Sequence, residues 1–385
     1  MKKRILLALV LLTVMIDIIG LLHPWYGENN GQSDNGWFSD QKITSWVGRT
    51  NTTFTGGYGE CVSGDGKYIY ILQEKTATST PNFVRYNPVN NSWNSLSVPP
   101  SVSFKNGVAM AYDYNGNFYV LTGSSYSDGA NRVEFYRYNI STDTWIRLAD
   151  SPHVQGAGDA IVYSGYDNRI YAFLGRAHYT GSYKPDVQGI FTRYDPTTDR
   201  WTNLSYPPWP GTDDGSSLVW TGGKYIYALQ GEYYENKPLR SFARYDITTD
   251  SWQVMSDIPA KDGVGDGGSL LWIGYYDQNY TNIIFALDGN GCNETPGYNF
   301  SVYYINKDTW QREDNIPSPI GYYVGNRLAY ASGKIWYWQG TPSTWKDGTG
   351  VYSYTYTAVQ VPELDSRITA LFSVILAALI FREQI

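Results

Sequence analysis

Four acidic residues stand beside glycines or another acid just before short apolar runs. They are Glu60, Asp159, Asp214 and Asp266. Two carboxyl groups held close together can supply an acid and a base for carbohydrate chemistry, whereas a partial ring of them can bind a cation, a sugar or a basic group. The same side chains can instead cap backbone N–H groups where strands begin. The sequence leaves both roles open.

The chain around these acids is repetitive. A tryptophan follows a tyrosine by seven residues in five places, and an Asn or Asp lies two residues before each tryptophan. The pairs are Tyr86/Trp93, Tyr138/Trp145, Tyr194/Trp201, Tyr245/Trp252 and Tyr303/Trp310, and the turn residues are Asn91, Asp143, Asp199, Asp250 and Asp308. Successive tryptophans lie 52, 56, 51 and 58 residues apart. Such a period is typical of one supersecondary unit per copy.

Each unit also contains an aromatic-rich run with period-two alternation. These runs span residues 68–72, 118–121, 170–174, 225–229, 283–287 and 335–338. Alternation bounded by Gly, Asn and Asp turns predicts a four-stranded antiparallel meander per unit. A single such sheet exposes both faces, so we expect the copies to pack around an axis, with the Tyr and Trp side chains filling the space between neighbouring sheets.

This Tyr–Trp spacing, repeated over residues 42–358, resembles that of the kelch family of β-propellers. The resemblance implies an all-β fold of radially arranged blades with four antiparallel strands each. Single glycines stand where kelch units usually carry a Gly-Gly doublet: Gly123, Gly175, Gly231, Gly289 and Gly340. The last of six units lacks its tryptophan, whereas Trp46 lies 47 residues before Trp93. We therefore predict a six-bladed propeller whose ring is closed by an N-terminal strand around Trp46.

In such blades, the loops into the innermost strands share one face with the loops between the second and third strands. The four acids, together with Asn106 and Asn326, would then surround the mouth of the central channel. The second set of loops is rich in Tyr, Ser, Gly and Asn, a composition typical of recognition surfaces. Its candidate binding residues are Tyr126, Arg176, His178, Tyr179, Tyr233, Tyr234 and Trp345.

The two ends of the chain predict export. Residues 1–24 contain three cations followed by an apolar run, as in a signal peptide or signal-anchor, and residues 25–41 form a linker. Residues 359–385 resemble the sorting tails that exosortase-like or archaeosortase-like transpeptidases process; the alternative is a weak membrane anchor. Seven sequons offer glycosylation sites, at Asn51, Asn90, Asn139, Asn203, Asn279, Asn293 and Asn299. Cys61 and Cys292 permit one disulfide outside the cytoplasm.

Composition and motifs argue against several classes of function. The chain carries 29 basic and 36 acidic residues, a net charge of −7, so it lacks a broad basic surface for nucleic acid. Three histidines, of which His153 and His178 follow the leader, give weak support for a copper site like that of kelch-type oxidases. No EF-hand loop, Rossmann loop, Walker loop or nucleophile elbow occurs, and we expect no metal or cofactor.

The leading hypothesis is an exported cell-surface module that binds a glycan or a protein partner through the loop face. A carbohydrate-active hydrolase, epimerase or lyase that uses Glu60, Asp159, Asp214 and Asp266 is the alternative, and a structural component of the envelope is the third. The binding module is favoured because the sequence lacks a complete catalytic set.

Overall fold

The computed structural model describes residues 46–49, 60–73, 82–99, 104, 107–123, 134–153, 156, 158–175, 190–233, 237–289, 299–313, 315–317, 327–339 and 350–356. These residues form β-strands joined by turns, and the only helical element among them is a 3-10 turn, η3 (Gln278–Tyr280). Within this part of the chain, no helix has the length and apolar character needed to cross a bilayer.

The strands form six antiparallel sheets of four strands each. The first three blades are β2 (Glu60–Gly64), β3 (Ile69–Gln73), β4 (Asn82–Asn87) and β5 (Ser92–Ser95); β6 (Ala109–Tyr112), β7 (Asn117–Leu121), β8 (Phe135–Asn139) and β9 (Thr144–Arg147); and β10 (Ala160–Ser164), β11 (Arg169–Leu174), β12 (Ile190–Asp195) and β13 (Arg200–Asn203). The fourth is β14 (Ser217–Trp220), β15 (Tyr225–Leu229), β18 (Phe242–Asp246) and β19 (Ser251–Val254), with the hairpin β16 (Glu232–Tyr233) and β17 (Lys237–Pro238) beside it. The fifth is β20 (Ser269–Leu271), β21 (Ile283–Leu287), β22 (Phe300–Tyr304) and β23 (Thr309–Arg312).

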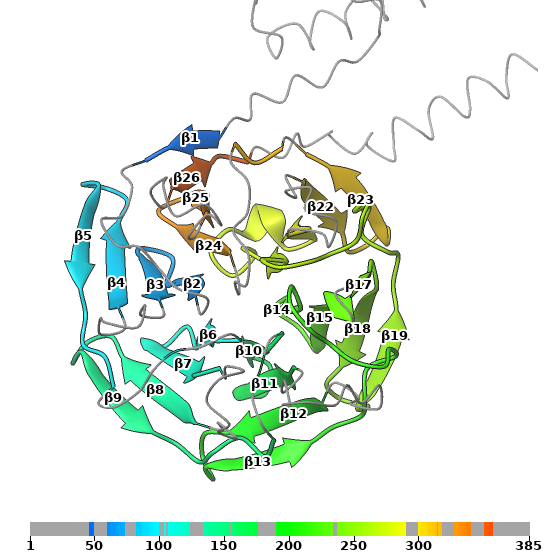
Figure 1. Cartoon of the computed structure of the whole chain (residues 1–385), viewed down its shortest axis with the longest axis horizontal. Helices are drawn as coiled ribbons and strands as arrows, with labels where there is room; N and C mark the ends of the chain where they lie inside the picture. Colours follow the sequence, from blue (N-terminus) through cyan, green and yellow to red (C-terminus); the bar gives the residue numbers. More distant parts are fainter. Residues whose placement is uncertain are drawn as a thin grey trace, which may run out of the picture. The chain divides into compact units, whose positions relative to one another are not determined.

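The sixth blade combines the two ends of the propeller. It contains β24 (Leu328–Ala331), β25 (Lys334–Trp338) and β26 (Val351–Tyr354), and its outermost strand is β1 (Trp46–Gly48). β1 pairs antiparallel with β26 (Figure 1), and the register places Trp46 opposite Tyr354. The predicted closure by an N-terminal strand is therefore confirmed.

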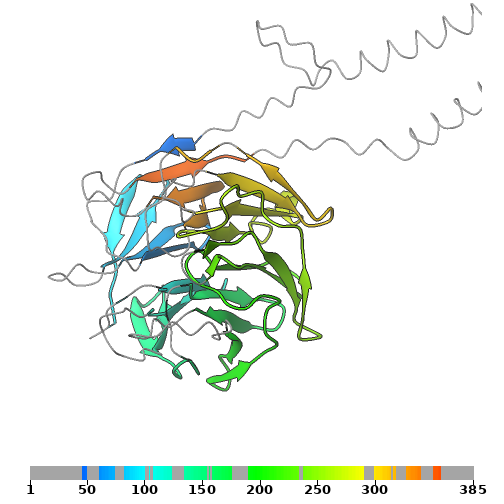
Figure 2. The same ribbon diagram turned by 45° about the vertical axis from the view of Figure 1, so that its right-hand side comes forward.

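The innermost strands β2, β6, β10, β14, β20 and β24 contact one another in that order, and β24 returns to β2 (Figures 1 and 2). The blades thus form a closed ring, which removes all but short sheet edges. The predicted six-bladed all-β propeller is confirmed.

The recurring tyrosines and tryptophans are cross-strand partners. Tyr245 lies opposite Trp252, and the same register joins the other four pairs. Each tyrosine is almost fully buried. In the fourth blade, both rings also pack on Phe191 of the third blade, at centroid distances of 4.8 Å for Tyr245 and 4.9 Å for Trp252. The repeated pair therefore joins neighbouring blades as well as neighbouring strands.

The Asp of each turn contributes to the same contact between blades. Asp250 adopts a left-handed conformation with φ of 49°, which Asp and Asn tolerate better than most residues. Its carboxylate accepts hydrogen bonds from the Tyr245 hydroxyl at 2.8 Å and from the Ser205 N–H of the third blade at 2.9 Å. The sequence marked this residue as a turn former, whereas the structure shows that it also links two blades.

Candidate functional site

The segments that precede the innermost strands, here called lead-in loops, pack against one another around the channel. Gly158 and Gly215 both have φ of +79°, and a Cβ at either would collide with the backbone of the next blade's loop, at Asp213 and Gly265 respectively. Only glycine permits this backbone approach. The contact of Gly215 with Gly265 brings the acids Asp214 and Asp266, which flank these two glycines, to the same place.

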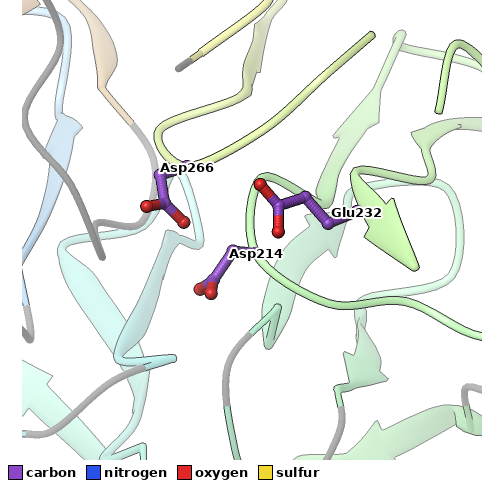
Figure 3. Close-up of side chains that lie close together, drawn as sticks. All are labelled: Asp214, Glu232 and Asp266. Carbon is purple, nitrogen blue, oxygen red and sulfur yellow. The ribbon is translucent and has the colours of Figure 1, made fainter. Parts of the chain in front are cut away.

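A third acid joins this pair from the loop that follows β15. Gly231 packs against the backbone of Asp214 and Gly215, and the N–H of Glu232 donates to the Asp214 carbonyl at 2.8 Å. The carboxylate oxygens of Asp214, Glu232 and Asp266 consequently lie within 4.8 Å of one another (Figure 3). We call these three residues the acidic cluster. Asp214 is half-buried and the other two are buried.

Close packing changes the protonation of the acidic cluster. Burial, followed by the negative charges of Asp266, Asp213 and Glu232, raises the pKa of Asp214 well above its usual range. A protonated Asp214 can donate a hydrogen bond to Asp266, so the cluster holds both donors and acceptors. Fully ionised, the three carboxylates could contribute oxygen ligands to a Ca²⁺ or Mg²⁺ ion, although Ca²⁺ requires about six to eight oxygens in all.

Glu60 lies elsewhere and has a different environment. It is fully buried and forms an ion pair with the equally buried Arg327, with Oε2 and Nη1 3.4 Å apart. Gln73 Nε2 lies 3.4 Å from its Oε1. Since β2 belongs to the first blade and Arg327 precedes β24 of the sixth, the pair joins these two blades. Glu60 is therefore not exposed at a channel mouth.

Asp159 caps the backbone. Its Oδ1 accepts hydrogen bonds from the N–H groups of Gly156 at 3.2 Å and Gly175 at 2.7 Å. Burial raises the pKa of this carboxyl well above its usual range, and the two N–H groups oppose that shift. The structural alternative stated for the four acids thus describes Asp159, while the functional one remains for Asp214 and Asp266.

Two acids, one in the acidic cluster and one beside it, were not among the sequence candidates. Glu232 directly follows Gly231, the glycine that occurs after the second strand in five of the repeat units. This adjacency is the signal that could have singled Glu232 out. Asp288 follows β21, and its carbonyl accepts from the N–H of Gly265 at 3.1 Å. Burial raises the pKa of Asp288 to about 7, although hydrogen bonds from Asn299 oppose the shift. Neither residue belongs to an inner strand, so the repeat pattern did not mark them.

Most candidate binding residues on the second set of loops lie outside the described residues. These are Tyr126, Arg176, His178, Tyr179, Tyr234 and Trp345, as are Asn106 and Asn326 on the lead-in loops. Tyr233 is described: it is half-buried in β16, directly after Glu232. The described part of the site is therefore the acidic cluster and its immediate surroundings.

The candidate glycosylation sites differ in their exposure to solvent. Asn90, Asn203 and Asn279 are exposed, whereas Asn139 and Asn299 are half-buried, and the Asn299 amide donates to Asp288. Asn51 and Asn293 lie outside the described residues. Cys61 is a buried free thiol whose pKa burial raises, and Cys292 also lies outside the described part.

Comparisons with known proteins agree with the fold. No family model matches the chain. N-acetylneuraminate epimerase 1 of Escherichia coli is 24% identical over 278 residues, which is 60% of this chain and 72% of that protein. A kelch-like protein of Aspergillus terreus, terF, is 30% identical over 163 residues, 40% of this chain and 34% of its own length.

Among solved structures, that of YjhT matches with a TM-score of 0.56 at 16% identity, covering 80% of this chain and 96% of that one. At this identity the likeness concerns the fold alone. The chain is a six-bladed β-propeller whose relatives in sequence include kelch-repeat proteins.

Proposed function

We propose that this chain is a kelch-type propeller that binds a neutral or amino sugar of a glycan at the acidic cluster. The observation that carries the proposal is the convergence of Asp214, Glu232 and Asp266 within 4.8 Å where the lead-in loops of two blades meet. A cluster that holds donors and acceptors at short spacing suits a ligand with several adjacent hydroxyl groups. Rigid strands on both sides support these loops.

The charge of the cluster selects among sugars. A carboxylated sugar such as N-acetylneuraminate would add a further negative charge beside the ionised carboxylates of the cluster, and like charges at this spacing oppose binding. Arg327, a cation before the neighbouring inner strand β24, is already paired with Glu60. A neutral sugar avoids this electrostatic cost. The protonated amino group of an amino sugar would be attracted by the same carboxylates.

The cellular setting is a proposal that rests on the two ends of the chain. A basic and apolar leader in residues 1–24 and a tail in residues 359–385 support export and retention at the envelope. An exported propeller would meet glycans at the cell surface. Tyr233, which directly follows Glu232, would then supply an aromatic ring beside the acidic cluster.

A carbohydrate epimerase is the second candidate, and two observations favour it. Several relatives bear the name N-acetylneuraminate epimerase. The raised pKa of Asp214 beside Asp266 is the arrangement in which one carboxyl group serves as acid and its neighbour as base. The same residues would bind sugar in either case, so catalysis is a separate question from binding.

Saturation-transfer NMR with the purified chain tests the proposal. We expect transfer to neutral and amino sugars and much weaker transfer to N-acetylneuraminate. The double variant Asp214→Asn/Asp266→Asn should abolish it, while Asp262→Asn, a change at an exposed acid in the same lead-in loop, should not. Binding that survives the double variant would contradict the site.

Proton NMR of each bound sugar over time separates the two functions. Appearance of a second stereoisomer with the wild-type chain but not with Asp214→Asn would indicate an epimerase. An unchanged spectrum together with binding would indicate a binding module. Absence of both binding and conversion for every sugar tested would sink the proposal.

A further inference from the structure

The channel has a second feature at the end opposite the acidic cluster. Each inner strand begins at its lead-in loop and ends at the turn to the next strand, so the six far ends meet together. A cavity of about 90 Å³ lies there, lined by residues of all six inner strands and of the turns that follow β6 and β20. Seven of its lining residues are Tyr or Trp, and none is charged.

An unusually long turn closes this end. Residues 272–282 join β20 to β21, whereas the second blade needs only residues 113–116 for the same connection. The long turn crosses the channel: Tyr276 stacks on Tyr330 of the sixth blade, with centroids 5.0 Å apart, and its ring lies against Gly66 of the first. Tyr275 packs on Tyr114 of the second blade at 4.1 Å. A side chain at Gly66 would collide with Tyr276.

Tyr114 is the centre of this aromatic group and is strained. Its φ of 56° is the left-handed conformation, which is uncommon for a bulky residue and costs free energy. Its ring contacts Tyr112 at 5.6 Å, Trp220 at 6.0 Å and Tyr276 at 6.0 Å. Strain of this kind often marks a functional position.

Two carboxylates lie near the aromatic group, although neither lines the cavity. Asp65 and Asp113, in the turns of the first two blades, contribute to raising the pKa of Tyr112, after burial, and Asp65 acts likewise on Tyr276. The nearby cations Lys67 and Arg85 lie over the ring of Tyr68, which does not line the cavity.

We propose that this cavity binds the head group of a small organic cation, a methylated ammonium. The faces of Tyr and Trp rings attract such cations, and seven of these rings line the cavity. The cavity is small, about 90 Å³, and its lining offers aromatic faces and no charged group. This site goes beyond the proposed function because it lies at the other end of the channel and uses none of the acidic cluster.

Titration of the full chain with tetramethylammonium and with choline tests the proposal, using tryptophan fluorescence because Trp220 and Trp272 line the cavity. We expect saturable binding of both. Dimethylbutanol, the uncharged isostere of choline, should bind at least about tenfold more weakly than choline, since it lacks the cation–π contribution. Equal binding of the isostere, or no binding of either cation, would overturn the proposal.

Variants at the floor of the cavity locate the site. Tyr114→Phe keeps the ring and should retain binding, whereas Tyr114→Gly, which suits the left-handed backbone, should weaken it about tenfold. Tyr330→Leu retains apolar volume without the ring face and provides a second test should the glycine variant fail to fold. Tyr206→Gly, at an exposed residue that does not line the cavity, is the control. Unchanged affinity in both Tyr114→Gly and Tyr330→Leu would refute the assignment.

Discussion

At the contact between the third and fourth blades, Trp252 donates its indole N–H to the Ser205 carbonyl at 2.9 Å, and Asp250 accepts from the N–H of the same residue. The three other contacts among blades one to five have the same pair of bonds, through Trp145, Trp201 and Trp310. At the two contacts of the sixth blade, the positions equivalent to Ser205 are residues 50 and 314, which lie outside the described residues. The indole nitrogens of Trp46 and Trp93 are buried without a partner among the described residues.

The sixth blade uses other interactions. Glu60 and Arg327 form their buried ion pair across its contact with the first blade. Ser332 donates its N–H to the Gly66 carbonyl at 2.8 Å and its hydroxyl to the Lys67 carbonyl at 3.0 Å. Trp336 packs on Tyr86 of the first blade at 5.4 Å.

The covalent connection explains the difference. In blades two to five, the third and fourth strands are joined by a turn, and that turn carries the Asp that binds the preceding blade. In the sixth blade, β26 and β1 come from opposite ends of the propeller, so no turn links them. Repetition therefore builds four contacts alike, while closure depends on residues that occur once in the chain.

Removal of β1 should produce the largest effect. Deletion of residues 42–50 exposes the edge of β26 and removes the Trp46 ring from its contacts with Phe300 and Tyr354, at 5.3 and 4.8 Å. The loss of one such tryptophan alone costs about 3 kcal/mol. Calorimetry should show a melting temperature lower by on the order of 10 °C. A melt identical to that of the intact chain would mean that β1 does not close the ring.

Breaking the buried ion pair between Glu60 and Arg327 should have the next largest effect on stability. Glu60→Ala leaves Arg327 buried and unpaired, at a cost of about 3–5 kcal/mol in the free energy of unfolding measured with denaturant. Replacement of both residues by Met should recover much of that loss, because an apolar pair needs no partner charge. If the single and double variants unfolded at the same denaturant concentration, the pair would not be what holds these blades together.

The turn acids should matter less individually. Asp250→Ala removes the acceptor for Tyr245 and Ser205 and places Ala in a left-handed conformation. We expect the free energy of unfolding to fall by about 2 kcal/mol. Asp250→Asn keeps an oxygen acceptor and tolerates the same φ, so it serves as the matched control. Equal destabilisation by both variants would argue that charge, rather than these bonds, is responsible.

The smallest expected effect measures a single hydrogen bond. Trp252→Phe loses both indole area and the bond to Ser205, whereas Trp46→Phe loses area alone. The first variant should therefore be about 1 kcal/mol more destabilised than the second in chemical denaturation. Equal destabilisation by the two variants would show that the indole hydrogen bond of Trp252 does not distinguish its contact from that of Trp46.

The repeat made much of the fold predictable. Period-two alternation located the second strand of every blade to within one residue, as at 225–229 for β15, and the spare Trp46 predicted the closure. These features are local or periodic, so they can be recognised from the order of residues in the sequence. Two of the four acids, Asp214 and Asp266, do share a site, but nothing in their spacing distinguished them from Glu60 and Asp159.

The chain order alone determined the number of blades, the register of Tyr245 with Trp252 and its equivalents, and the residue that completes the ring. Only the tertiary structure decided that Glu60 pairs with Arg327, 267 positions away, and that Glu232 joins Asp214 and Asp266. The physical reason is that strand periodicity is a property of neighbours in sequence. The environment of a carboxyl group instead depends on which backbones approach across the ring, and here glycines at 215 and 231 set that approach.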